Sequence, residues 1–220
     1  MMQLINWNLL QQQDKPVLDR FNKKYLGTNF EIKTEITFEP FYGNPENAKI
    51  FFLALNPGYK EQDIIAHQNP EFLKLVNDNL NFRNDDFPYY YFRTDKVYEN
   101  FEGFKWSKRI FKELISEVEA DSLSKAICFI QFHGYHSSKF HKLDQVISSQ
   151  KVTFDFIRRA IQLKLPIVMM RAKLVWYEAL PELKDYAYLI FLKNPRKPTI
   201  SKNNMVKTSD YYLLLDALRK

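Results

Sequence analysis

The sequence predicts an α/β fold, a three-layer α/β/α sandwich around a central, mostly parallel four-stranded sheet. Short apolar runs recur along the chain, and most are nearly continuous, as in strands that are buried on both faces. Segments with helical spacing lie between them, and right-handed crossovers then place helices on both faces of the sheet. The expected strands cover residues 32–38, 50–55, 127–132, 167–170 and 188–192, of which the last four form the parallel sheet.

The helices are predicted from the spacing of apolar residues and from their capping residues. Residues 70–80 follow Asn69, a favourable N-cap, and a last helix begins near Thr208 or Ser209 with an apolar face over 211–218. The other helices are expected at 16–25, 104–118, 153–164 and 172–180. Because no repeat and no long linker interrupts the alternation, we expect one domain over 1–220. It comprises an N-terminal helix and edge segment (1–40), a core (41–205) and a C-terminal helix (206–220).

The composition is that of a globular protein with a high share of aromatic residues. Hydrophobic residues make up 45% of the 220 positions, enough for a sizeable core, and aromatic residues make up 16%. These rings indicate a thick core, a stacking pocket, or both. Cys128 is the only cysteine, which excludes an intramolecular disulfide and a cysteine-based zinc site. We expect this thiol, like Trp106 and Trp176, to belong to the core.

The chain carries no recognisable targeting or membrane segment. The N-terminal residues lack a basic region followed by a long apolar run, and no apolar stretch reaches about 18 residues. We expect a cytoplasmic protein without membrane association, and a monomer. Neither a Gly-rich dinucleotide loop nor a phosphate-binding Lys motif occurs, so no nucleotide cofactor is expected.

A local basic segment lies near the C-terminus. Residues 186–209 contain no acidic residue, whereas the whole chain has a net charge of only +6. The basic residues of this segment are Lys193, Arg196, Lys197, Lys202 and Lys207. Such a segment is typical of contacts with a phosphate backbone, although a charge run is more often an ordinary solvated surface.

Polar residues follow the expected parallel strands at the edge where ligands bind in open α/β sheets. Asn56-Pro57-Gly58-Tyr59 follows the first of these strands, and Gln131 with His133 follows the next. The last strand leads into a second Asn-Pro, at Asn194. A long irregular region, 81–101, contains the aromatic segment 88–92, and a loop of that length in a compact domain is typically functional.

These strand ends resemble the uracil-DNA glycosylase superfamily over roughly residues 41–205. The most specific part is Ile-Phe-Phe-Leu-Ala-Leu-Asn-Pro-Gly at 50–58, which is similar to the first motif of the mismatch-specific uracil/thymine branch. The resemblance implies that the protein hydrolyses the N-glycosidic bond of a flipped uracil-like or 5-substituted base in double- or single-stranded DNA, without metal or cofactor. By position, Asn56 is the residue that holds the attacking water. Asn194 and the loop to Ser201 resemble the second motif.

The resemblance also assigns residues around the base and the DNA. The catalytic residues are Asn56 and Asn194; the base-binding residues are Gly58, Tyr59, Tyr90, Gln131 and His133; and the nucleic-acid-binding residues are Arg171, Lys193, Arg196, Lys197, Ile200, Ser201 and Lys202. Ile200 is expected to act as an apolar plug that fills the space left by the base. Gly58 stands where the strictly uracil-selective branch has a Tyr, which predicts tolerance of a 5-methyl group.

Two departures from the family pattern keep other functions open. The most active branch has an Asp and a His where this chain has Asn56 and Asn194, so neither position supplies a general base. Arg196, Lys197 and Pro198 also lengthen the second loop, and one misplaced donor costs roughly 10²- to 10³-fold in rate. The alternatives are a non-catalytic nucleic-acid-binding protein on the same fold and a hydrolase of small nucleosides or nucleotides.

Two further patterns allow more than one interpretation. His133, His136 and His141, with Asp144, have spacings compatible with a metal cluster. We expect instead that His133 or His136 lies at the pocket edge, that His141 lies at the surface, and that no metal is bound. Arg171, directly after the strand at 167–170, either contacts phosphate or pairs with a carboxylate such as Glu178.

Overall fold

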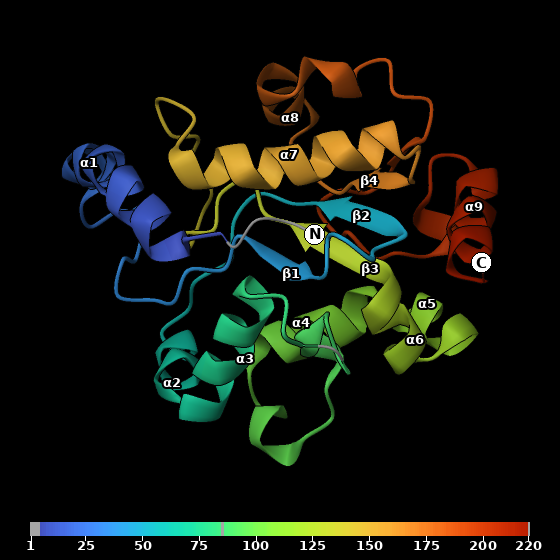
Figure 1. The fold of residues 1–220 in the computed structure, drawn as a ribbon, viewed down its shortest axis with the longest axis horizontal. Helices are drawn as coiled ribbons and strands as arrows, with labels where there is room; N and C mark the ends of the chain where they lie inside the picture. Colours follow the sequence, from blue (N-terminus) through green and yellow to red (C-terminus); the bar gives the residue numbers. More distant parts are fainter. Residues whose placement is uncertain (1–4, 85, 220) are drawn as a thin grey trace.

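The computed structural model describes residues 5–84 and 86–219. This part of the chain is an α/β protein whose central sheet has five strands, one more than expected, in the order β1-β3-β2-β4-β5 (Figure 1). The strands are β1 (Phe41–Gly43), β2 (Ile50–Leu53), β3 (Ile127–Ile130), β4 (Ile167–Met169) and β5 (Leu189–Phe191). β2 to β5 are parallel, as predicted, whereas β1 joins the edge of β3 antiparallel.

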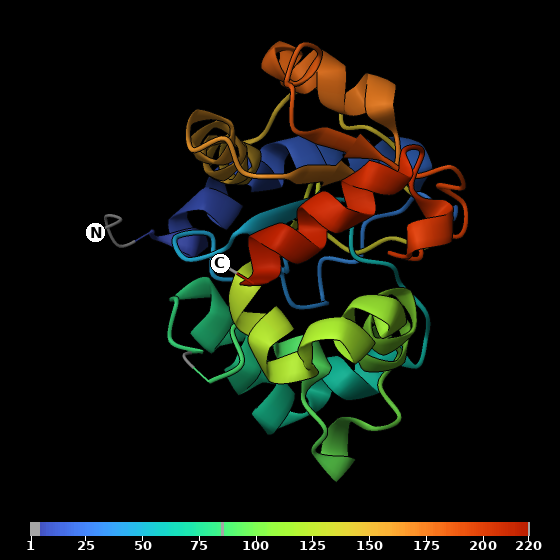
Figure 2. The same cartoon turned by 90° about the vertical axis from the view of Figure 1, so that its right-hand side faces the viewer.

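Helices cover both faces of the sheet (Figure 1). α1, α7 and α8 lie on one face, and α2 to α6 lie on the other, where α9 packs beside α5 and α6 (Figure 2). Their bounds are α1 Trp7–Tyr25, α2 Asp63–Gln68, α3 Pro70–Leu80, α4 Glu102–Ile110, α5 Lys112–Val118, α6 Ala120–Ala126, α7 Ser148–Gln162, α8 Lys173–Ala179 and α9 Thr208–Arg219. None of the helices in the described residues combines the length and apolar character needed to cross a membrane.

Alternation along the buried strands supplies apolar side chains to two cores. Phe52 of β2 and Phe129 of β3 belong to the core beneath α3 to α6, whereas Phe51 and Cys128 belong to the core beneath α1 and α7. Successive side chains of a strand point to opposite faces, so a continuous apolar run fills both cores. This is why the four parallel strands were predictable, and it confirms that the thiol of Cys128 is buried.

The strand order creates a switch point beside β2. The chain passes from β2 to β3 on one side and then returns to β4 on the other side, so the connections diverge between β2 and β4. Ligands of open α/β sheets bind outside the carboxyl ends of the strands at such a point. The segments that begin there are residues 54–60 after β2 and residues 170–171 after β4.

The predicted strand at 32–38 is wrong. Only an isolated bridge between Lys33 and His136 forms there. The side chain of Asn22, on α1, accepts from the amide of Ile32 at 2.9 Å and donates to its carbonyl at 2.8 Å. Because this side chain satisfies the backbone groups that a neighbouring strand would pair, the segment forms no ladder.

Several helix boundaries differ from the predictions for local reasons. The expected helix 104–118 divides into α4 and α5, because the carbonyl of Ile110 accepts from the amide of Ile200 at 2.8 Å. α1 begins at Trp7 rather than at Pro16, because Asn6 caps it at the amide of Leu9. α2 and α6 were not predicted, and α7 begins earlier than expected. The bounds of α3, its Asn69 cap and the start of α9 are confirmed.

Candidate functional site

A cavity of about 920 Å³ lies at the carboxyl ends of β2, β3 and β4. The segment after β2 contributes residues 54–60, Gln131 follows β3, and Met170 and Arg171 follow β4. α4 supplies the opposite wall, including Trp106. The cavity therefore occupies the place that the strand order predicts for a ligand, and we call it the strand-end pocket.

The side chain of Asn56 is held in one orientation at this pocket. Its Nδ2 donates to the carbonyl of Pro57 and to Oγ of Ser137, each at 2.9 Å, and more distantly to the Ser137 carbonyl at 3.3 Å. Its Oδ1 accepts no hydrogen bond from any described residue. An amide fixed through its nitrogen in this way offers its oxygen to a water or a ligand.

Gln131 presents a second free acceptor. Its side chain is almost entirely buried, and its Nε2 donates to the hydroxyl oxygen of Tyr42 at 3.2 Å. Its Oε1 is buried without a partner among the described residues. An unpaired buried acceptor costs about 1–3 kcal/mol, so a donor that enters the pocket and reaches this oxygen is stabilised.

Aromatic side chains form much of the remaining wall. They are Tyr42, Tyr59, Phe72, Tyr91, Phe101, Trp106, Phe129 and Phe140. Trp106 is half-buried and meets Phe129 edge-on, with ring centres 5.7 Å apart. It was expected in the core, but it packs against the core with one side and lines the pocket with the other. Trp176, in contrast, is fully buried as predicted, and its Nε1 donates to the carbonyl of Ala54.

A buried carboxylate, Glu39, lies deep in the pocket with 1% of its surface exposed. Its Oε1 accepts from the hydroxyls of Tyr90 and Tyr91, the latter at 2.8 Å. Its Oε2 lies 3.0 Å from Nε2 of His136 and 3.7 Å from Nε2 of His67. Burial acts to raise the pKa of Glu39, but the contacts with His136 and His67 outweigh it and lower the pKa.

Burial shifts the ionisation of the groups around this carboxylate. It raises the pKa values of Tyr90 and Tyr91 well above their ordinary range, and the charge of Glu39 adds to the effect, so both hydroxyls keep their protons and donate them. Burial also lowers the pKa of His67 to about 4. The cluster therefore combines an ionised carboxylate with two phenols that donate to it.

Gly134 brings Glu39 and His136 together. The amide of Glu39 donates to the Gly134 carbonyl at 2.9 Å, in the loop that also carries His136. A Cβ atom at Gly134 would lie 2.6 Å from the ring of Phe38 and 2.6 Å from the backbone nitrogen of Pro40. Only glycine allows this approach of the two segments.

Several predicted base-site residues meet at the strand-end pocket. Asn56, Gly58, Tyr59, Gln131 and Arg171 all line it. Tyr90 does not; it is fully buried behind the wall and contacts Glu39. His133 does not line it either, because its buried ring stacks on Phe140, with ring centres 5.5 Å apart.

The loop after β5 differs from the prediction. Asn194 is exposed and does not line the pocket, and its Oδ1 accepts from the amides of Arg196 and Lys197 at 3.1 and 3.2 Å. Ile200 is fully buried in a core, so its side chain is not presented to the pocket or to solvent in this conformation. Pro198 is the residue of this loop that reaches the pocket.

The predicted basic contacts lie on the surface beside the pocket. Lys193, Arg196, Lys197 and Lys202 are exposed, and none forms an ion pair with a carboxylate in the described part of the chain. Ser201 is half-buried next to them. Arg171 pairs with no carboxylate among residues 5–84 and 86–219. It donates to the carbonyls of Pro195 and Arg196 at 3.1 and 3.5 Å and so ties the β5 loop to the pocket edge. Glu178 pairs with Lys142 instead.

The histidine cluster suggested by the sequence does not form. His141 is half-buried rather than exposed, and its Nε2 lies 2.9 Å from the hydroxyl of Tyr25. His136 instead joins Glu39 and His67, two residues that the sequence reasoning missed. An acidic residue among the apolar residues 36–41 was a signal for a buried carboxylate. His67 lies on α2, which the sequence did not predict.

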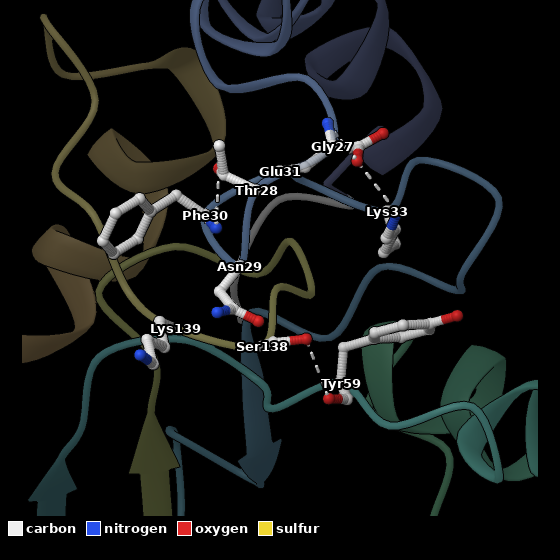
Figure 3. Close-up of a pocket in the computed structure, with 9 residues that line it drawn as sticks. All are labelled: Gly27, Thr28, Asn29, Phe30, Glu31, Lys33, Tyr59, Ser138 and Lys139. Carbon is white, nitrogen blue, oxygen red and sulfur yellow. Dashed lines mark hydrogen bonds and ion pairs between the residues drawn. The ribbon is translucent and has the colours of Figure 1, made fainter.

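A second, shallower cavity of about 490 Å³ adjoins the strand-end pocket (Figure 3). Tyr59, Ser138 and Lys139 line both cavities. Nζ of Lys33 lies 5.6 Å from the ring centre of Tyr59 and pairs with Glu31 at 3.2 Å. Tyr59 therefore separates a deep aromatic pocket from an open depression that carries two lysines.

Comparison with models of protein families finds no match, and comparisons with curated proteins and with solved structures likewise find none.

Proposed function

We propose that the strand-end pocket binds a flipped nucleobase and that the protein hydrolyses the N-glycosidic bond of a uracil-like or 5-substituted base in DNA, on a uracil-DNA glycosylase-like fold. One observation carries this proposal: in the same aromatic-lined pocket, Asn56 and Gln131 each have a side-chain oxygen that no described residue hydrogen-bonds. A uracil-like base has an N–H donor between two carbonyl groups, which suits the buried oxygen of Gln131. The aromatic walls suit its flat ring.

Asn56 suits the chemistry of bond cleavage. As the bond between the sugar and the base breaks, its electron pair leaves with the base and the sugar carbon gains positive charge. Water then attacks that carbon, and the proton that the water loses passes through solvent to the departing base. Oδ1 of Asn56 accepts a hydrogen bond from that water and places it for attack. An amide takes no proton from water at neutral pH, so we expect a slow enzyme compared with one that has a carboxylate at this position.

The surrounding charges suit an anionic polymer. The exposed basic residues Lys193, Arg196, Lys197 and Lys202 lie on the loop that Arg171 ties to the pocket edge. Contacts between these residues and phosphates release counterions, so DNA affinity should fall steeply as salt concentration rises. Because Ile200 is buried, its side chain cannot replace an extruded base in this conformation, and we expect single-stranded or mismatched DNA to be preferred.

The buried Ile200 also supports the second candidate, a hydrolase of small nucleosides or nucleotides. Such a substrate needs the pocket and its free acceptors but no plug and no duplex contact. The two candidates differ in the dependence on salt, because a small substrate neutralises few charges.

A base-release assay tests the proposal. The purified protein and its Gln131→Leu variant are incubated with labelled single- and double-stranded oligonucleotides containing uracil, thymine mismatches, hypoxanthine, etheno adducts or 5-modified cytosines, and with free nucleosides. We expect abasic sites in single-stranded uracil-containing DNA, with release reduced at least about 10-fold in the variant because one acceptor is lost. Release from free nucleosides alone would support the second candidate. Salt-sensitive DNA binding without any release would contradict the enzyme and leave a non-catalytic reader.

A further inference from the structure

Glu39, His67 and His136 bring three metal-ligating side chains together on the wall of the strand-end pocket. One ligand atom from each residue lies within 4.8 Å of the others. The side chains are 1%, 5% and 4% exposed, respectively. Buried carboxylates and imidazoles are paired or coordinate metals, so the way in which these three atoms are satisfied decides their role.

The contacts of His136 define which of its nitrogens is free. Nδ1 lies 2.8 Å from the carbonyl oxygen of Gly58, which can only accept, so Nδ1 carries the proton. In the neutral ring, Nε2 then holds a lone pair, and it lies 3.0 Å from Oε2 of Glu39. Within the described part of the chain, neither of these two buried atoms has a hydrogen-bond partner. A proton or a metal ion must lie between two acceptors that face each other in a buried site.

His67 approaches the same point from α2. Its Nε2 lies 3.7 Å from Oε2 of Glu39, and its ring centre lies 4.8 Å from that of His136 at a nearly perpendicular angle. Its Nδ1 is buried without a hydrogen-bond partner among the residues that the structure describes. Nε2 of the second imidazole therefore supplies a third potential ligand near Oε2 of Glu39.

We propose that Glu39, His67 and His136 bind a divalent transition-metal ion of the zinc class. Two imidazole nitrogens and one carboxylate oxygen form a ligand set found in zinc sites that keep an open position. Atoms bound tetrahedrally at about 2.0–2.1 Å from zinc lie about 3.3 Å apart, and the distances of 3.0 and 3.7 Å to Oε2 bracket that value. Magnesium and calcium favour all-oxygen sets, so two imidazoles disfavour them.

The surroundings of the three residues suit such an ion. The Gly58 carbonyl orients His136, and the Tyr90 and Tyr91 hydroxyls hold the other oxygen of Glu39, as partners outside the ligand set do in metal sites. Because all three ligands line the pocket, a water or a ligand atom that completes the coordination would come from the pocket side. The inference does not rest on the proposed function, and it departs from the expectation that no metal binds.

Metal titration without DNA tests the site and separates it from the base-release activity. Chelator-treated protein is titrated with Zn²⁺ by calorimetry and with Co²⁺ by visible absorption. We expect one equivalent of Zn²⁺ to bind, four- or five-coordinate Co²⁺ bands to appear, and His67→Gln and His136→Gln to weaken binding at least about 10-fold. His141→Gln is the matched control, because His141 bonds to Tyr25 and is not one of the pocket residues. We expect it to bind Zn²⁺ as the wild type does.

Each outcome bears on the proposal even if a variant folds poorly. Circular dichroism checks the fold, and Tyr91→Phe, which removes only one hydroxyl from Glu39, should weaken Zn²⁺ binding without loss of structure. If the folded wild-type protein binds no stoichiometric Zn²⁺, the proposal is overturned. A proton shared by His136 and Glu39 would then explain their close approach. Equal loss of binding in the His141 and His67 variants would overturn it as well.

Discussion

The loops after β2 and β5 begin with the same dipeptide but do different things. Asn56 lies at the pocket with its nitrogen held and its oxygen free, whereas Asn194 is exposed and uses its oxygen to close its own turn. β2 lies inside the sheet beside the switch point, and β5 lies at the edge. The position of a strand in the sheet, rather than the Asn-Pro pair that follows it, therefore determines which asparagine lies at the pocket.

The largest expected effect concerns the β5 loop. Ile200→Ala should lower the free energy of unfolding by about 2–5 kcal/mol, because it leaves a cavity where the side chain is now fully buried. Urea unfolding measures the change. Val206→Ala is the control; with 52% of Val206 exposed, it should change stability by less than about 0.5 kcal/mol. If Ile200→Ala were as mild as this control, the loop would not be anchored in the core as described.

The next effect concerns the segment that supports Glu39. Gly134→Ala should lower the free energy of unfolding by about 1–3 kcal/mol, because the added carbon meets the backbone of Pro40. Gly58→Ala, in the β2 loop, is the matched control, since a Cβ atom there meets nothing within 4 Å. Equal unfolding midpoints and m-values for the two variants would contradict the close approach at Gly134.

The smallest effect sharpens the role of the β2 loop in specificity. Gly58→Tyr should reduce release of thymine-like and 5-substituted bases relative to uracil by roughly 10-fold, because a ring at the pocket edge excludes a 5-methyl group. The space around Gly58 allows the substitution without a clash at Cβ. The ratio of kcat/KM values for the two base types measures the change. An unchanged ratio would contradict a role of Gly58 in base discrimination.

The sequence pattern predicted the strands and helices that depend on residues close together in the chain. Each parallel strand is a continuous apolar run, and α3 begins at a cap and a proline that act within one turn. The segment 32–38 has apolar residues at strand spacing, but the side chain of Asn22 replaces its pairing partner. That contact joins segments ten residues apart and has no signal in the pattern itself.

The residues of the candidate site likewise fall into those that the sequence predicted and those that it did not. Asn56 and Gln131 were found because they directly follow strands, and strand ends share one edge of the sheet. Glu39 and His67 were missed because their approach to His136 depends on a glycine in a distant loop and on a helix with a weak pattern. Residues 194–201 were placed at the same edge, but nothing in their pattern indicates that the amide of Ile200 donates to the carbonyl of Ile110 or that the Ile200 side chain is buried.

The most direct test of the central claim compares Asn56→Ala with Asn194→Ala in release of uracil from single-stranded DNA. If only the β2 loop serves the pocket, the rate at saturating DNA should fall about 10²-fold in Asn56→Ala, because the residue that holds the water is lost. Asn194→Ala should stay within about 3-fold of the wild type, since an exposed side chain outside the pocket is removed. Equal losses in the two variants, or a loss confined to Asn194→Ala, would contradict the account.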